Sequence, residues 1–175
     1  MNLPNVLSLF RLCLTAFFIL AITYQRYTIA LSLFVAQAIS DLLDGFFARI
    51  MHKKTDLGAW LDPIADKVML VSSYLVLGFQ GIVPFWVVAI VLLRDVVLML
   101  GFFVLHLLSY RMVPSPTLLG KATTLFQMVT VLYLLWSTTR EFKEYFYYAT
   151  AAFTLLSGFQ YVLLGLSALY HKETV

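Results

Sequence analysis

Residues 41–67 read DLLDGFFARIMHKKTDLGAWLDPIADK and contain five of the nine acidic residues of a 175-residue chain. The chain around this stretch is apolar, with 62% hydrophobic and 12% charged residues and a mean hydropathy of +0.90. A soluble domain needs more charge than this to solvate its surface. The composition therefore predicts an integral membrane protein, in which a cluster of carboxylates needs an explanation.

Six apolar runs are each long enough to cross a hydrocarbon core of ~30 Å, which takes about 20 helical residues. They cover residues 5–23, 28–48, 57–79, 83–109, 116–137 and 144–170. The connections between the runs are too short to separate domains. We expect an all-α fold in which residues 1–175 form one domain of six transmembrane helices.

Basic residues are unevenly divided between the two sides of the predicted helix bundle, and this division sets its orientation. Seven are on the side of the termini and three are on the opposite side. The first group is Arg11, Arg49, Lys53, Lys54, Arg111, Lys121 and Lys172, and the second is Arg26, Arg140 and Lys143. The imbalance predicts cytoplasmic termini and explains the positive charge without a nucleic-acid partner. With no targeting extension before the first span, we expect a bacterial inner membrane.

Four acids of the opening stretch fall into two pairs on consecutive predicted helices. Asp41 and Asp44 are i and i+3 neighbours, and each such pair shares one helix face. Asp62 and Asp66 are i and i+4 neighbours on the next helix. The nearer acid of each pair is nine residues from Lys53 in the connection. In an antiparallel hairpin, all four carboxylates are therefore expected at similar depth.

Ionised carboxylates inside a membrane each cost roughly 2.5 to 3.5 kcal/mol, and they repel one another, so positive charge must lie among them. Lys67 and Arg49 cannot balance four negative charges, whereas one or two divalent cations can. Oxygen-only ligation without His or Cys suits Mg²⁺ or Mn²⁺ rather than Zn²⁺. The pattern predicts a site for one or two such ions.

Small residues accompany the acids. Gly45, Ala48 and Gly58 lie beside them in the sequence, and small side chains let a backbone or a ligand approach closely. A metal cluster next to bare backbone and Arg49 suits a pyrophosphate, because the metals neutralise its charge and leave phosphorus open to in-line attack.

The same residues resemble the signature of the CDP-alcohol phosphatidyltransferases. This signature is D-x-x-D-G-x-x-A-R, eight residues, G, three residues, D, three residues and D, and every spacing is met. Its positions are occupied here by Asp41, Asp44, Gly45, Ala48, Arg49, Gly58, Asp62 and Asp66. The start PNVLSLFR and the segment SGFQY in the last predicted helix are also similar to this family.

The resemblance implies transfer of a phosphatidyl group from CDP-diacylglycerol to an alcohol, with release of CMP, in a cavity open to the cytoplasm. Asp41, Asp44 and Asp62 would bind two divalent metals. Asp66 would be a further ligand and the general base for the acceptor hydroxyl. The CDP portion would be held by Gly45, Ala48, Arg49 and Gly58. The family is typically dimeric, which implies a homodimer in membrane lipid.

Two cations outside the signature bear on the acceptor, Arg94 in the fourth predicted helix and Lys121 in the fifth. The segments VLLRDVV and LLGKATTLFQ are similar to the branch of this family that uses glycerol 3-phosphate, although Thr123 replaces a second lysine. We expect Arg94 and Lys121 to bind the acceptor phosphate. The alternative for Arg94 is a structural ion pair with some other acid, since Asp95 is about 100° away around the helix. The alternative for Lys121 is a lysine that extends to the membrane interface.

Two other functions fit parts of the pattern. The Arg-Asp pair with a single lysine is also similar to the cardiolipin synthases of the same family, whose acceptor is phosphatidylglycerol. A small cation or proton-coupled transporter also uses intramembrane carboxylates, but usually spreads them through repeat-related helices. Here four acids are on one hairpin and no inverted repeat is visible, which favours the enzyme.

Overall fold

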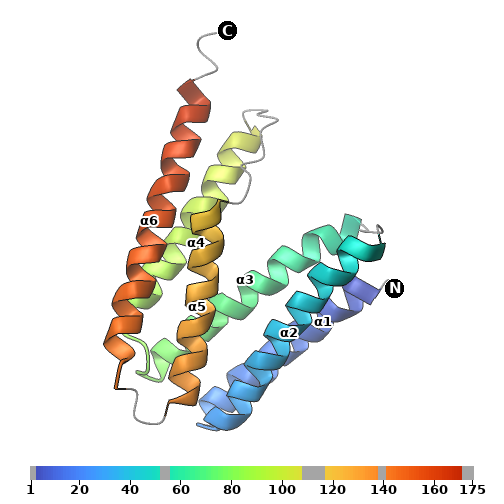
Figure 1. Ribbon diagram of the computed structural model, residues 1–175, viewed down its shortest axis with the longest axis vertical. Helices are drawn as coiled ribbons and strands as arrows, with labels where there is room; N and C mark the ends of the chain where they lie inside the picture. The colour runs from blue at the N-terminus through green and yellow to red at the C-terminus, as the bar shows by residue number, and fades with distance from the viewer. Residues whose placement is uncertain (1–2, 52–55, 108–116, 138–140, 171–175) are drawn as a thin grey trace. The chain divides into compact units, whose positions relative to one another are not determined.

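The computed structural model describes residues 3–51, 56–107, 117–137 and 141–170. Side chains are described within these ranges except at 3–8, 42–51, 56–64, 102, 105–107 and 168–170. The described residues form helices joined by short turns (Figure 1). The helices are α1 (Leu3–Thr23), α2 (Tyr27–Met51), α3 (Asp56–Phe79), α4 (Phe85–Leu107), α5 (Leu118–Trp136) and α6 (Lys143–Tyr170).

These helices confirm the all-α prediction, and their ends differ from the predicted apolar runs by no more than three residues. Two of the described helical segments are long and apolar enough to cross a membrane, Leu118–Trp136 and Lys143–Ser167. Shorter apolar stretches occupy Leu9–Thr23 and Tyr27–Asp41. The membrane spans of the other helices remain a prediction.

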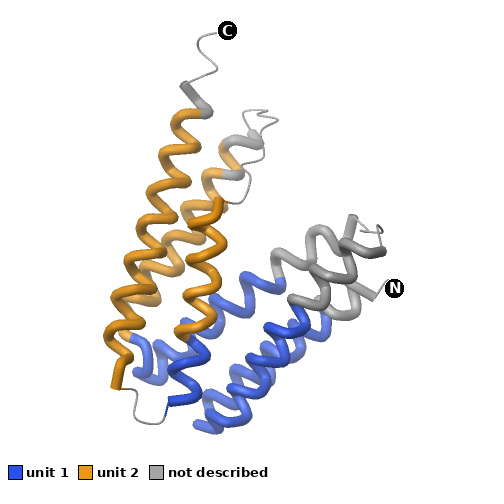
Figure 2. Tube along the Cα trace, in the orientation of Figure 1, with its two compact units in different colours: residues 1–83, 131–140 blue, residues 84–130, 141–175 orange. Residues whose placement is uncertain are grey.

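The chain divides into two compact units, coloured separately in Figure 2. Unit 1 comprises residues 1–83 and 131–140, and unit 2 comprises residues 84–130 and 141–175. The boundary passes through α5, whose last turns from Val131 belong to unit 1.

Unit 1 is organised around α1, which packs against both α2 and α3 (Figure 1). The rings of Phe18 on α1 and Phe34 on α2 lie 5.7 Å apart between centroids, and neither side chain has exposed surface. Tyr74 and Leu77 of α3 are equally buried. Dense van der Waals packing of such large side chains holds helices together even where the surroundings are apolar.

Left-handed residues end two of the helices of unit 1, α1 and α3. Gln25 has a φ of 57°, and after it the N–H of Arg26 bonds to the Ala21 carbonyl at 2.8 Å, a Schellman cap on α1. Gly81, with a φ of 68°, ends α3 in the same way. Pro84 immediately precedes α4 and cannot extend the preceding helix. These caps explain the short connections that the sequence predicts.

Unit 2 contains α4, the first part of α5, and α6. α4 packs against α6, and hydrogen bonds join α5 to α6. The three bonds run from Thr123 Oγ1 to the Phe153 carbonyl at 3.0 Å, from Gln127 Nε2 to Thr154 Oγ1 at 3.0 Å, and between the hydroxyls of Thr130 and Thr150 at 2.8 Å. The side chains are buried. We call this row of hydrogen bonds the α5–α6 seam. Hydrogen bonds of this kind hold helices together where packing alone gives little specificity.

Candidate active site

Arg11 brings two signature acids together within unit 1. Its side chain comes from α1 and has no exposed surface. Its Nη1 lies 3.1 Å from Oδ1 of Asp41 on α2, and it also donates a hydrogen bond to Oδ1 of Asp66 on α3. The first and last acids of the signature therefore meet at one guanidinium.

The two carboxylates remain accessible although their cation is buried. The relative exposure of the side chain is 39% for Asp41 and 43% for Asp66. A buried guanidinium is tolerated when oxygen atoms accept its hydrogen bonds. These bonds also fix the positions of the two carboxylates that supply the oxygen atoms. Both acids are thus anchored by Arg11 and still open to a ligand.

The donor set fits a divalent cation as far as it is described. Carboxylate oxygens from two helices already converge on a positive charge, and hard cations such as Mg²⁺ prefer oxygen ligands. Among the described side chains, no group of three or more potential metal ligands occurs. Asp44 and Asp62, the other two predicted ligands, are outside the described side chains.

The remaining signature positions lie on the same two helices. Asp44, Gly45, Ala48 and Arg49 are in α2, and Gly58 and Asp62 are in α3. Their side chains lie outside the described part of the structure. Their contacts with metals and with CDP therefore stay predictions, while Asp41 and Asp66 are seen together.

Arg11 is the residue of this site that sequence reasoning missed. The sequence analysis counted it only among the basic residues that set the orientation of the protein in the membrane. A signal was nevertheless present. Arg11 lies just over two turns inside α1, within a run of apolar residues. A charged side chain in such a place is rare unless it is paired, so a carboxylate partner was to be sought.

Polar side chains continue from the ion pair along the contact between α1 and α2. Thr15 donates a hydrogen bond of 2.9 Å to the Arg11 carbonyl, and its Oγ1 lies 3.5 Å from Oε1 of Gln37. Gln37 is fully buried one turn before Asp41. This contact helps to fix α1, and therefore Arg11, against the helix that carries Asp41.

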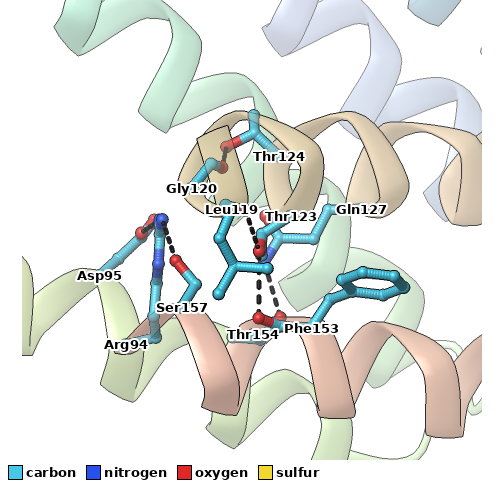
Figure 3. Close-up of polar contacts among 10 residues, drawn as sticks. All are labelled: Arg94, Asp95, Leu119, Gly120, Thr123, Thr124, Gln127, Phe153, Thr154 and Ser157. Atoms are coloured by element: carbon cyan, nitrogen blue, oxygen red, sulfur yellow. Dashed lines mark hydrogen bonds and ion pairs between the residues drawn. The ribbon is translucent and has the colours of Figure 1, made fainter. Parts of the chain in front are cut away.

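A second cluster surrounds Arg94 in unit 2 (Figure 3). Its Nη1 lies 2.8 Å from Oδ1 of Asp95, and its Nη2 donates a hydrogen bond of 3.2 Å to Ser157 on α6. The expectation that Asp95 lies too far around the helix is wrong, because the long arginine side chain reaches its neighbour. The ion pair is largely buried, with exposures of 11% for Arg94 and 15% for Asp95. The structural pairing considered for Arg94 is therefore present, with Asp95 as its partner.

Lys121 and Thr123 lie on different faces of α5. Lys121 is exposed in the first turn, where its backbone N–H bonds to the Thr117 carbonyl at 3.1 Å. Thr123 is fully buried, and its hydroxyl is 2.8 Å from the Leu119 carbonyl and 3.0 Å from that of Phe153 (Figure 3). Thr123, the position at which this segment departs from the pattern it resembles, therefore joins α5 to α6.

Comparison with known proteins gives a family and close relatives. The CDP-alcohol phosphatidyltransferase profile matches residues 1–156, which include the whole signature. A CDP-diacylglycerol–glycerol-3-phosphate 3-phosphatidyltransferase of Aquifex aeolicus (strain VF5) is 37% identical over 135 residues, covering 75% of this chain and 74% of the relative. The protein of the same name from Escherichia coli (strain K12) is 34% identical over 172 residues, covering 92% of this chain and 93% of the relative. A likeness that extends over most of both chains shows that this protein belongs to the CDP-alcohol phosphatidyltransferase family of enzymes.

Proposed function

We propose that this protein transfers the phosphatidyl group of CDP-diacylglycerol to the hydroxyl of glycerol 3-phosphate, giving phosphatidylglycerophosphate and CMP in phospholipid biosynthesis. The observation that carries the proposal is the meeting of Asp41 and Asp66 at Arg11, in a chain of this family. The names of the Aquifex and Escherichia relatives support glycerol 3-phosphate over phosphatidylglycerol as the acceptor.

Two Mg²⁺ or Mn²⁺ ions would be held by the four signature acids Asp41, Asp44, Asp62 and Asp66. When bound, such ions neutralise the pyrophosphate and polarise the phosphorus that is attacked. The convergence of Asp41 and Asp66 on a cation supports this assignment. Arg11 contributes one positive charge that belongs to the protein itself and offsets part of the repulsion among the acids.

Asp66 is the general base in this proposal. Its carboxylate takes the proton of the acceptor hydroxyl as that oxygen bonds to the phosphorus of the phosphatidyl group. The phosphorus–oxygen bond to CMP breaks, CMP leaves with the electron pair, and Asp66 returns its proton to water. Arg11 is a positioning residue, since its ion pair holds the Asp66 carboxylate beside Asp41.

Separate groups of residues bind the two substrates. Gly45, Ala48, Arg49 and Gly58 would make room for and hold the CDP portion. Arg94 and Lys121 would bind the phosphate of the acceptor. Within the described structure, Arg94 keeps one buried donor, Nε, without a hydrogen-bond partner. Neutralising Arg94 or Lys121 should raise the KM for glycerol 3-phosphate far more than that for CDP-diacylglycerol.

The proposed enzyme is one catalytic domain of six transmembrane helices over residues 1–175. It lies in a bacterial inner membrane as a homodimer, with its termini and active site facing the cytoplasm. The apolar α5 and α6 support the membrane location, and the excess of basic residues on the side of the termini supports the orientation.

A product assay tests this function. The full-length protein in detergent, with CDP-diacylglycerol and Mg²⁺, is supplied separately with glycerol 3-phosphate, phosphatidylglycerol, serine or inositol phosphate. CMP and the lipid product are followed for each acceptor. Turnover with glycerol 3-phosphate alone is the expected result. Turnover with phosphatidylglycerol alone would identify a cardiolipin synthase, and no CMP release with any acceptor would contradict the proposed reaction.

A further inference from the structure

Tyr161 contacts both of the elements that the proposed function assigns to the acceptor. Its hydroxyl accepts a hydrogen bond of 3.1 Å from the backbone N–H of Thr117, directly before α5. Its ring centroid lies 6.0 Å from Cζ of Arg94 on α4, near the outer limit of a cation–π contact. One side chain of α6 thus joins Arg94 to the start of α5.

The first turn of α5 fits closely around the Tyr161 hydroxyl. The N–H of Gly120 donates a hydrogen bond of 3.0 Å to Oγ1 of Thr117, which caps the helix. A Cβ added to Gly120 would lie 2.8 Å from Oη and 3.1 Å from Cε2 of Tyr161, so one of them would have to move. Lys121 is the next residue, and its N–H bonds to the Thr117 carbonyl. The turn that carries Lys121 is therefore held against Tyr161.

We propose that Tyr161 is a positioning residue for the acceptor, which fixes the guanidinium of Arg94 relative to the turn that carries Lys121. The inference rests on the proposed function, in which these two cations bind the phosphate of glycerol 3-phosphate. A phosphate binds more tightly to two cations that are already held in place, because less ordering accompanies binding. Asp95 and Ser157 restrain Arg94 from α4 and α6, and Tyr161 adds the link to α5.

Tyr161→Phe keeps the ring beside Arg94 and removes the hydroxyl that bonds to Thr117. The KM for glycerol 3-phosphate should rise about three- to tenfold, as expected for the loss of one hydrogen bond. The KM for CDP-diacylglycerol and kcat should each stay within about twofold, since this proposal gives Tyr161 no role at the signature residues or at the reacting atoms. A residue that acted only on folding would change the amount of active protein without separating the two KM values.

Gly120→Ala tests the same contact from α5 while Tyr161 is unchanged. The added methyl group must displace the hydroxyl, so the KM for glycerol 3-phosphate should rise again. Gly101→Ala is the matched control, because a Cβ at Gly101 on α4 meets nothing within 4 Å. In the double variant, Tyr161→Phe removes the closest contact of the new methyl group, so the two effects should not add.

The outcomes separate this inference from the function on which it rests. Each variant is first measured for thermal unfolding in detergent, and Tyr161→Phe is the deciding variant if Gly120→Ala does not fold. A KM for glycerol 3-phosphate in Tyr161→Phe equal to that of Gly101→Ala, or an equal rise in both KM values, overturns the role of Tyr161 alone. Unmutated protein that releases no CMP with glycerol 3-phosphate overturns the proposed function and the inference together.

Discussion

The guanidinium of Arg11 lies 3.1 Å from the carboxylate of Asp41, with the arginine fully buried and the acid partly exposed. The same nitrogen also reaches Asp66 on a third helix. Two carboxylates that would otherwise repel each other are held side by side by a cation that neither helix supplies. Arg11 therefore links α1 to the chemistry of the signature, and its removal should affect both folding and activity.

Arg11→Met should lower the stability of the metal-free protein by about 1.5 to 3 kcal/mol, because hydrogen bonds to charged groups are lost and two acids are left to repel each other. Arg11→Lys keeps the charge but not the planar geometry, so its loss should be smaller. Thermal unfolding in detergent with a chelator measures both variants. Arg26→Met is the control, since Arg26 is exposed in the α1–α2 turn. Equal midpoints for Arg11→Met and Arg26→Met would show that the ion pair contributes nothing.

Removal of divalent metals should abolish CMP release, and either Mg²⁺ or Mn²⁺ should restore it. The same ions should raise the unfolding midpoint, because a ligand that binds only the folded state stabilises it by mass action. Asp41→Asn should reduce this rise by removing one ligand. A midpoint of the unmutated protein that does not respond to either ion would contradict the metal site without reference to activity.

Asp66→Asn and Asp62→Asn should each abolish CMP release while the protein still inserts into the membrane, since removing a charge from a predicted membrane span eases insertion. CMP release is measured on equal amounts of protein recovered from the membrane fraction. Glu144→Gln, which neutralises an exposed acid in the first turn of α6, should retain full activity. Activity that survives both aspartate substitutions would rule out the carboxylate site.

The α5–α6 seam should contribute measurably to stability. Thr130→Val removes the bond of 2.8 Å to Thr150, and hydrogen bonds between membrane helices are worth about 0.6 kcal/mol on average. Thr124→Val is the matched control, since the Thr124 hydroxyl bonds only to the Gly120 carbonyl of its own helix in the described contacts. The free energy of unfolding should fall more for Thr130→Val than for Thr124→Val. Equal losses would mean that the contact with α6 adds nothing.

Length and hydropathy were enough to predict the helices, because an apolar run of about 20 residues has few other stable forms in lipid. The meeting of Asp41 and Asp66 was also foreseeable from their spacing around a hairpin. The part played by Arg11 depends on how α1 packs, which no local pattern encodes. The pairing of Arg94 with Asp95 was misjudged because only the directions in which the two side chains leave the helix were considered. The length of the arginine side chain, which lets it reach Asp95, was not.

The threonines of the seam also bear on the order in which the protein is assembled. A hydroxyl without an acceptor is costly in lipid. Thr123 and Thr130 each donate to a carbonyl of α5 itself, one turn earlier, in addition to facing α6. At these two positions α5 carries no unsatisfied hydroxyl when it enters a bilayer ahead of α6. The later helix then docks onto two hydroxyls that are already hydrogen-bonded within α5.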